Sequence, residues 1–237
     1  MIEGRRDSAR AAVWRQALSV GVATGAYGFS FGALGVASGL SLVQACVLSL
    51  LMFTGGSQFA FASVFAAGGG PVAAIATASL LGIRNGFYAL QMAPLLRPRG
   101  PARLLAAHLT LDESTAVGTA QIALNPDRPE LARLGFWATG GTIFVLWNVS
   151  TLAGAVLGET LGDPRKYGLD AAAGAAFLAL LWPRLGSAHP RWVVPVAVIA
   201  TLVLIPVAPA GVPVLAAALV AIAAAWRDRA EPSERRR

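Results

Sequence analysis

The sequence predicts an all-α fold: a polytopic transmembrane helical bundle with broken or re-entrant helices and about 6–8 membrane segments. The chain carries no Asp, Glu, Lys, Arg or His between Arg15 and Arg84. Because about 20 apolar residues cross a bilayer, this interval alone holds enough chain for about three crossings. The composition agrees, since 56% of the residues are hydrophobic, 13% are charged and the mean hydropathy is +0.62. That charged share is about half the share in a soluble domain.

Eight apolar stretches are separated by glycine- or proline-rich turns. They cover residues 16–38, 41–66, 71–96, 104–124, 134–158, 168–182, 191–208 and 211–226. No linker between them is long enough to separate two domains. We therefore expect a single transmembrane domain over residues 16–226, a basic cytoplasmic N-terminal tail over 1–15 and a charged cytoplasmic C-terminal tail over 227–237.

The net charge of +7 is concentrated in the two flanks of the chain. Arginines precede the first apolar stretch and follow the last one, so the positive-inside rule places both termini in the cytoplasm. Because many apolar stretches follow the basic start, we expect the first one to be an uncleaved membrane segment rather than a signal peptide. No basic face is interleaved with aromatic residues, which argues against binding of nucleic acid.

Two topologies fit the apolar stretches. If all of them cross, the termini share one side, but the arginines of residues 97–103 then face outward against the positive-inside rule. If the first stretch is re-entrant and 104–124 does not fully cross, about six crossings remain and these arginines move inside. Glycines recur every three or four residues from Gly21 to Gly39, a spacing that fits either a close-packed helix face or a broken helix.

The first polar group inside an apolar stretch is Thr54-Gly55-Gly56-Ser57-Gln58. Adjacent glycines weaken a helix, so we expect a break here. The break would expose N–H groups that favour a carboxylate at the start of the second half-helix, and carbonyl groups that favour a cation at the end of the first. Such ends suit a zwitterionic amino acid, as in transporters with discontinuous helices. The alternative is a small-residue packing site in which Gln58 bonds a neighbour.

The second polar group is Arg84 with Asn85, and Tyr88 lies on the same helix face as Arg84. An arginine far inside an apolar segment is costly unless it is paired or hydrated. We therefore expect Arg84 to be buried and paired. The alternative is that its side chain snorkels to the membrane interface.

The third polar group contains His108, Asp112 and Glu113. On one continuous helix, His108 and Asp112 share a face and Glu113 lies on the adjacent face. Desolvation favours the protonated form of a carboxyl group, so either acid could carry a coupling proton, whereas an ion pair with Arg84 would hold it ionised. The alternative is an interfacial amphipathic helix with a solvated acidic face.

The sequence lacks the common signatures of metal and nucleotide chemistry. It contains no HExxH, CxxC, GxGxxG or GxxxxGK[ST] pattern. We therefore predict that the chain is not an enzyme and has no catalytic residues, metal site or cofactor. Two rival hypotheses remain: an intramembrane hydrolase that uses Ser57 or Ser114 with His108, and a membrane subunit that does not itself transport.

These three polar groups, in this order and spacing, resemble the AzlC-like family of branched-chain amino acid permeases, the larger subunit of a two-component exporter. The similarity runs from about residue 17 to about 226 and is most specific at Gly55–Phe59, at Arg84 with Tyr88, and at Asp112-Glu113. The resemblance implies export of leucine, isoleucine and valine, with methionine as a further candidate, through the bacterial cytoplasmic membrane. It also implies a small multispan AzlD-type partner subunit.

On this hypothesis, residues 16–226 form a transporter domain that passes through the lipid bilayer several times. We assign the following roles to its residues. The substrate-binding residues are Thr54, Gly55, Gly56, Ser57, Gln58, Arg84, Asn85 and Tyr88, and the proton-coupling residues are Asp112, Glu113 and His108. Apolar side chains such as Phe59 line the pocket. The family often has a polar residue two before the arginine, a histidine after it and a threonine before the acidic pair, where this chain has Gly82, Asn85 and Leu111.

Overall fold

The computed structural model describes residues 2–161, 192–208 and 212–230 of the chain. This part consists of helices and their connections and contains no β-strand, which confirms the predicted all-α class. The apolar stretch predicted over 168–182 and residues 231–237 of the predicted C-terminal tail lie outside it. The helices are α1 (Ile2–Ala37), α2 (Leu42–Leu51), α3 (Gly55–Ala66), α4 (Pro71–Leu96), α5 (Ala102–His108), α6 (Asp112–Leu124), α7 (Pro129–Leu161), α9 (Val193–Leu204) and α10 (Val212–Ala230).

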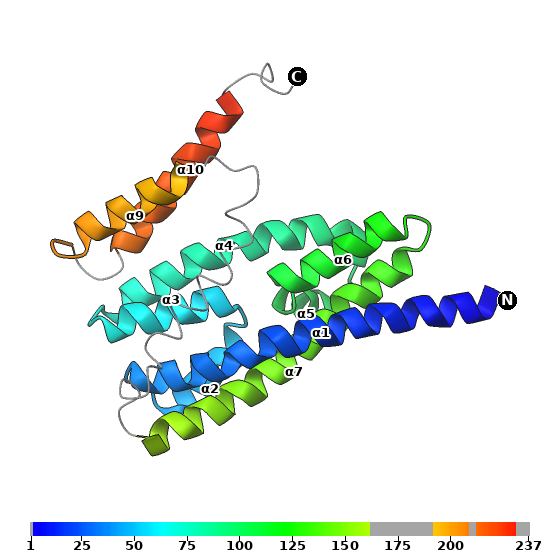
Figure 1. Cartoon of the computed structure of the whole chain (residues 1–237), viewed down its shortest axis with the longest axis horizontal. Helices are drawn as coiled ribbons and strands as arrows, with labels where there is room; N and C mark the ends of the chain where they lie inside the picture. Colours follow the sequence, from blue (N-terminus) through cyan, green and yellow to red (C-terminus); the bar gives the residue numbers. More distant parts are fainter. Residues whose placement is uncertain (1, 162–191, 209–211, 231–237) are drawn as a thin grey trace.

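Helices α1 and α7 pack side by side over most of their length (Figure 1). Glycines make this contact possible, because a Cβ atom on Gly25 would lie only 2.6 Å from Cβ of Leu146. Gly154 of α7 in turn lies directly against the carbonyl oxygen of Phe29 in α1. The glycine spacing therefore marks a close-packed helix face. The alternative prediction, that the first stretch is broken or re-entrant, is wrong, because α1 is one continuous helix to Ala37.

The segment 41–66 is broken where the sequence predicts. Helix α2 ends at Leu51 and α3 begins at Gly55, the first of the two adjacent glycines. The chain then folds back, because a Cβ atom on Gly39, just before α2, would lie 3.6 Å from the ring of Phe65 near the end of α3. This segment, the first hairpin, therefore enters and leaves at the same end of the bundle.

The segment 104–124 is broken as well, so the continuous helix expected there is wrong. Helix α5 ends at His108 and α6 begins at Asp112. Ser114 stabilises the break, because its hydroxyl accepts a hydrogen bond from the Leu111 N–H (2.9 Å) and donates one to the Leu109 carbonyl (2.7 Å). We refer to α5–α6 as the second hairpin.

The second hairpin also starts and ends at one end of the bundle. It follows α4 and precedes α7, and the Arg133 side chain of α7 donates from Nε to the Leu95 carbonyl of α4 (2.9 Å). Near the end of α6, Gln121 donates to Gln16 of α1 (2.9 Å). The stretch 104–124 thus does not run through the bundle. This agrees with the predicted topology in which that stretch does not fully cross the membrane.

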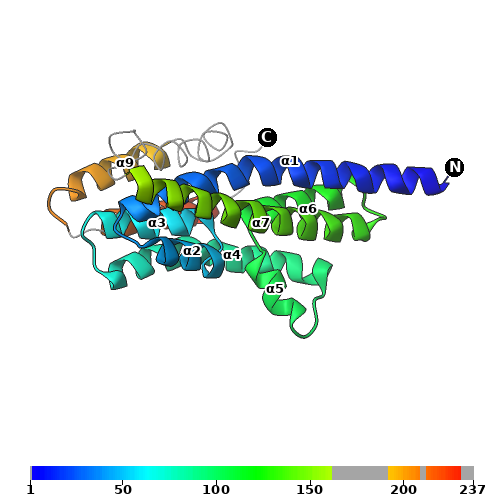
Figure 2. The same cartoon turned by 90° about the horizontal axis from the view of Figure 1, so that it is seen from below.

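The charged ends of α1, α4 and α7 lie together, at the end that holds the N-terminus (Figures 1 and 2). We call it the basic end. The opposite end contains the connections 38–41 and 67–70, which carry no Lys or Arg. The first hairpin enters from that opposite end and the second from the basic end, so their breaks meet inside the bundle. The arginines at the basic end of the described chain include Arg10, Arg15, Arg97, Arg99, Arg103, Arg128 and Arg133.

Within the described residues, the helical segments Asp7–Ala37 and Pro129–Thr160 are long and apolar enough to cross a membrane by length and composition. Helix α4 has 26 residues, a length of about 39 Å, but it includes Arg84 and Asn85. Helices α9 and α10 pack mainly on each other. The predicted count of membrane segments stays a prediction.

Candidate functional site

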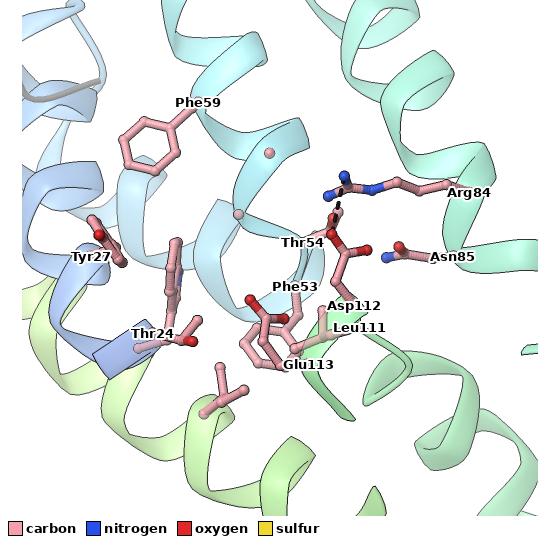
Figure 3. Close-up of a pocket in the computed structure, with 14 residues that line it drawn as sticks. Thr24, Tyr27, Phe53, Thr54, Phe59, Arg84, Asn85, Leu111, Asp112 and Glu113 are labelled. Atoms are coloured by element: carbon pink, nitrogen blue, oxygen red, sulfur yellow. Dashed lines mark ion pairs between the residues drawn. The ribbon is translucent and has the colours of Figure 1, made fainter. Parts of the chain in front are cut away.

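The two helix breaks meet at a cavity inside the bundle (Figure 3). Its volume is about 70 Å³, several times the roughly 10–15 Å³ that one water molecule requires. Both breaks and helices α1, α3, α4, α6 and α7 contribute to its wall. The lining residues are Thr24, Tyr27, Phe53, Thr54, Gly55, Gly56, Phe59, Arg84, Asn85, Leu111, Asp112, Glu113, Ile143 and Trp147.

An ion pair between α4 and α6 forms the charged wall of the cavity. Nη1 of Arg84 lies 3.2 Å from Oδ2 of Asp112 (Figure 3). The two side chains remain 39% and 21% exposed, respectively, so the pair is accessible from the cavity. The Nε atom of Arg84 is buried and makes no hydrogen bond in the structure. Arg84 is therefore paired, as predicted, but it is only partly buried, because its side chain faces the cavity.

Gly55 and Gly56 allow two side chains to approach the start of α3. A Cβ atom on Gly55 would lie 2.7 Å from the ring of Trp147, and one on Gly56 would lie 3.1 Å from Nη2 of Arg84. Thr54 precedes α3 without a capping side-chain hydrogen bond. The positive end of the α3 dipole and the guanidinium group thus lie side by side, which favours a bound anion.

Asp112 and Glu113 occupy the first turn of α6, where the helix dipole favours negative charge. Figure 3 shows that the two carboxylates point in different directions. Asp112 faces Arg84 and has Asn85 beside it, whereas Glu113 points away from Arg84, toward the wall formed by Thr24. The cavity is therefore lined by two carboxylates that lie on different sides, and the Asp112 carboxylate is the one beside Arg84.

Gln58 is fully buried and holds the first break together. Its Nε2 donates to the carbonyl groups of Met52 (2.8 Å) and Ser49 (3.4 Å), and its Oε1 accepts from Nε1 of Trp147 (2.9 Å). These carbonyl groups belong to the end of α2, where the sequence predicted binding of a cation. Gln58 thus bonds its neighbours, as the alternative interpretation of this segment predicts, and binding of a cation at the end of α2 stays a prediction.

We expect Gln58→Leu to lower the thermal stability of the protein. The change leaves the buried Met52 carbonyl and the Trp147 N–H without partners, and each such loss costs about 1–3 kcal/mol. Thermal unfolding of the purified protein in detergent measures the effect. Gln91→Leu, at an exposed position of α4, is the matched control and should unfold like the wild type. Equal stability of the Gln58→Leu protein would contradict the bracing role.

The structure brings most of the predicted site residues together and leaves four outside the cavity wall. His108 packs its ring against Phe53 and Phe144, with centroid distances of 5.6 and 5.5 Å. Ser57, Gln58 and Tyr88 do not line the cavity either. The predicted residues that do line it are Thr54, Gly55, Gly56, Arg84, Asn85, Asp112 and Glu113, with Phe59 on the apolar wall.

Four lining residues on the two long helices were missed by the sequence reasoning. Thr24 and Tyr27 come from α1, and Ile143 and Trp147 come from α7. Thr24 and Tyr27 are polar residues three positions apart, and so on one helix face, in a stretch without charged residues, which is a usable signal. Ile143 and Trp147 read as ordinary core residues in the sequence, so only the fold shows that they line the cavity.

The described residues show no hydrolytic arrangement. No hydrogen bond joins His108 to Ser57 or Ser114 there, and the Ser114 hydroxyl is engaged at the second break. The residues 28–32 spell Gly-Phe-Ser-Phe-Gly and fit a GxSxG pattern, but they lie within α1 rather than at a strand-to-helix turn. The described chain also brings no three His, Cys, Asp or Glu side chains together for a metal ion.

Comparison with known proteins identifies the family. The family model described as AzlC protein matches residues 19–161, more than half of the chain, and this range includes both hairpins, Arg84 and Asp112. No curated protein and no solved structure matches the chain. The chain therefore belongs to the AzlC family, a transporter family of membrane proteins whose function is related to branched-chain amino acid transport.

Proposed function

We propose that this protein is a secondary transporter that exports leucine, isoleucine and valine, and also methionine, across the bacterial cytoplasmic membrane. The observation that supports this most is the meeting of two helix breaks at the Arg84–Asp112 ion pair, beside a cavity with an apolar wall. Discontinuous helices in transporters form substrate sites near the bilayer midplane, where their ends bind charged groups.

In this proposal the basic end faces the cytoplasm, in line with the positive-inside rule. Helices α1, α4 and α7 cross the bilayer, and the two hairpins are re-entrant. The 10 residues of α2 extend about 15 Å, about half of a hydrocarbon core of about 30 Å. The three apolar stretches predicted after Leu161 would then return the C-terminus to the cytoplasmic side.

The cavity matches the chemistry of an apolar amino acid. The substrate carboxylate binds Arg84 and the N-terminus of α3, because both carry positive charge. The substrate ammonium group binds Glu113, Asp112 or both, since Gln58 occupies the carbonyl groups of α2. The aliphatic side chain packs against apolar lining residues, namely Phe53, Phe59, Ile143 and Trp147.

Proton coupling follows from competition for Asp112. The substrate ammonium group binds the ionised Asp112 carboxylate from the cytoplasmic side, so no proton is bound there while the substrate is carried outward. A proton that binds Asp112 from the outer side releases the substrate and is carried inward, where Asp112 gives it up and pairs with Arg84 again. A small multispan AzlD-type subunit assembles with the chain, and His108 supports the site from behind Phe53 rather than binding the proton itself.

The test is counterflow of labelled leucine in proteoliposomes, with and without the small partner subunit and against an unrelated solute. We expect leucine exchange that appears only with both subunits. Arg84→Gln should abolish this exchange, whereas Arg99→Gln, an exposed change in the α4–α5 connection, should retain it.

Three outcomes would contradict the proposal. Folded protein without exchange under any condition would point to another substrate. Full flux through the partner alone would favour a subunit that does not transport. Unchanged exchange in Arg84→Gln would remove the Arg84 site from substrate binding.

A further inference from the structure

A second, larger hollow lies between α4 and α5, outside the site described above. It is an open groove with a volume of about 480 Å³. Figure 2 shows α5 and the connection before it projecting from the side of the bundle, so the groove lies at the molecular surface. Most of its wall is apolar and comes from Ala89, Leu90, Ala93, Leu96, Ala106 and Ala107.

Two arginines stand at one end of this groove. Nε of Arg97 donates to the Pro94 carbonyl (3.1 Å) and Nε of Arg103 donates to the Pro98 carbonyl (3.2 Å). Both arginines line the groove. Among the described residues neither forms an ion pair with a carboxylate. The backbone bonds thus hold both guanidinium groups in place, and their positive charge remains uncompensated there.

The groove therefore combines a long apolar wall with a fixed pair of positive charges at the basic end. From this combination we propose that the α4–α5 groove binds an anionic phospholipid. Its phosphate group pairs with Arg97 and Arg103, and one acyl chain lies along the alanine- and leucine-lined wall. Basic pockets between membrane helices on the cytoplasmic side select lipids with anionic headgroups in this way.

The apolar wall distinguishes a lipid from a soluble phosphate compound. A soluble anion would use the two arginines alone and leave Leu90 and Leu96 uncovered. A phospholipid pairs with the arginines through its phosphate group and covers Leu90 and Leu96 with its acyl chain, because one molecule carries both groups. The groove also extends to Thr110 within the second break, so a lipid seated there contacts the hairpin that carries Asp112.

The test is native mass spectrometry of the full chain in detergent with equal amounts of phosphatidylglycerol and phosphatidylcholine of the same acyl length. We expect one phosphatidylglycerol to be retained in preference to phosphatidylcholine by about 30-fold for two arginine contacts. The double change Arg97→Gln with Arg103→Gln should remove this preference. Arg99→Gln, in the same connection but outside the groove wall, should keep it.

A second pair of variants tests the apolar wall without changing charge. Ala107→Trp fills the groove and should weaken retention of both lipids, whereas Leu105→Trp, which lies outside the wall, should not. Equal retention of the two lipids by the wild type would overturn the proposal, as would an unchanged preference in the double variant. Displacement of phosphatidylglycerol by millimolar glycerol phosphate would show that the site binds a soluble phosphate compound instead.

Discussion

Asp112→Asn is expected to abolish pH-driven export while leaving the protein folded, inserted and partly active in substrate exchange. Asparagine keeps the size of the side chain and its place beside Arg84, which lies 3.2 Å from the Asp112 carboxylate. It cannot bind and release the coupling proton, so a pH gradient no longer drives transport. The measurement is leucine flux in proteoliposomes with an imposed pH gradient, compared with leucine counterflow without one.

Two carboxyl-to-amide changes serve as controls for Asp112→Asn. Glu130→Gln alters an exposed ion pair with Arg128 and should leave both kinds of flux unchanged, because exposed pairs contribute little. Glu113→Gln should weaken substrate binding but keep the response to pH. Full pH-driven export by the Asp112→Asn protein would exclude Asp112 from coupling. If only the Glu113→Gln protein loses pH-driven export, the coupling proton is assigned to Glu113.

Gly154→Ala is expected to destabilise the protein strongly. The added methyl group would meet the carbonyl oxygen of Phe29 in α1, and this atom belongs to a helix backbone that cannot rotate away. Overpacking of this kind costs about 1–3 kcal/mol, and more where backbones are in contact. The thermal midpoint in detergent and the yield of monodisperse protein both report the loss.

Gly141→Ala, on the same helix, is expected to raise the thermal stability of the protein rather than lower it. A Cβ atom there meets nothing within 4 Å, so alanine is free to improve the helix by about 0.5–1 kcal/mol. We expect a raised thermal midpoint for Gly141→Ala and a lowered one for Gly154→Ala. A similar midpoint for the two proteins would show that α1 and α7 do not depend on glycine contacts.

Local chemistry explains which parts of the fold could be predicted. The break before α3 follows from two adjacent glycines, and pairing of Arg84 follows from the cost of leaving an arginine unpaired among apolar residues. The second break has no such signal, because Leu109-Thr110-Leu111 reads as ordinary helix. It depends on the hydrogen bonds of Ser114 to the backbone of these residues.

Long-range contacts explain the rest. The glycines of α1 fit either a broken or a close-packed helix until α7, more than a hundred residues later, is placed against them. The fold-back of the first hairpin is visible only in the proximity of Gly39 and Phe65. Gln58 was expected to contact substrate, and only its bonds to the Met52 and Ser49 carbonyl groups and to Trp147 show that it braces the break.

The entry of the two hairpins from opposite ends has an electrical consequence. If the breaks lie near the bilayer midplane, an ion reaching Asp112 from either side crosses only part of the membrane field. The full field is worth about 2.3 kcal/mol per charge at 100 mV, so half of it is about 1.2 kcal/mol. Binding of the ion from one side and its release to the other would then each depend on part of the membrane voltage. The two parts would add up to the full voltage.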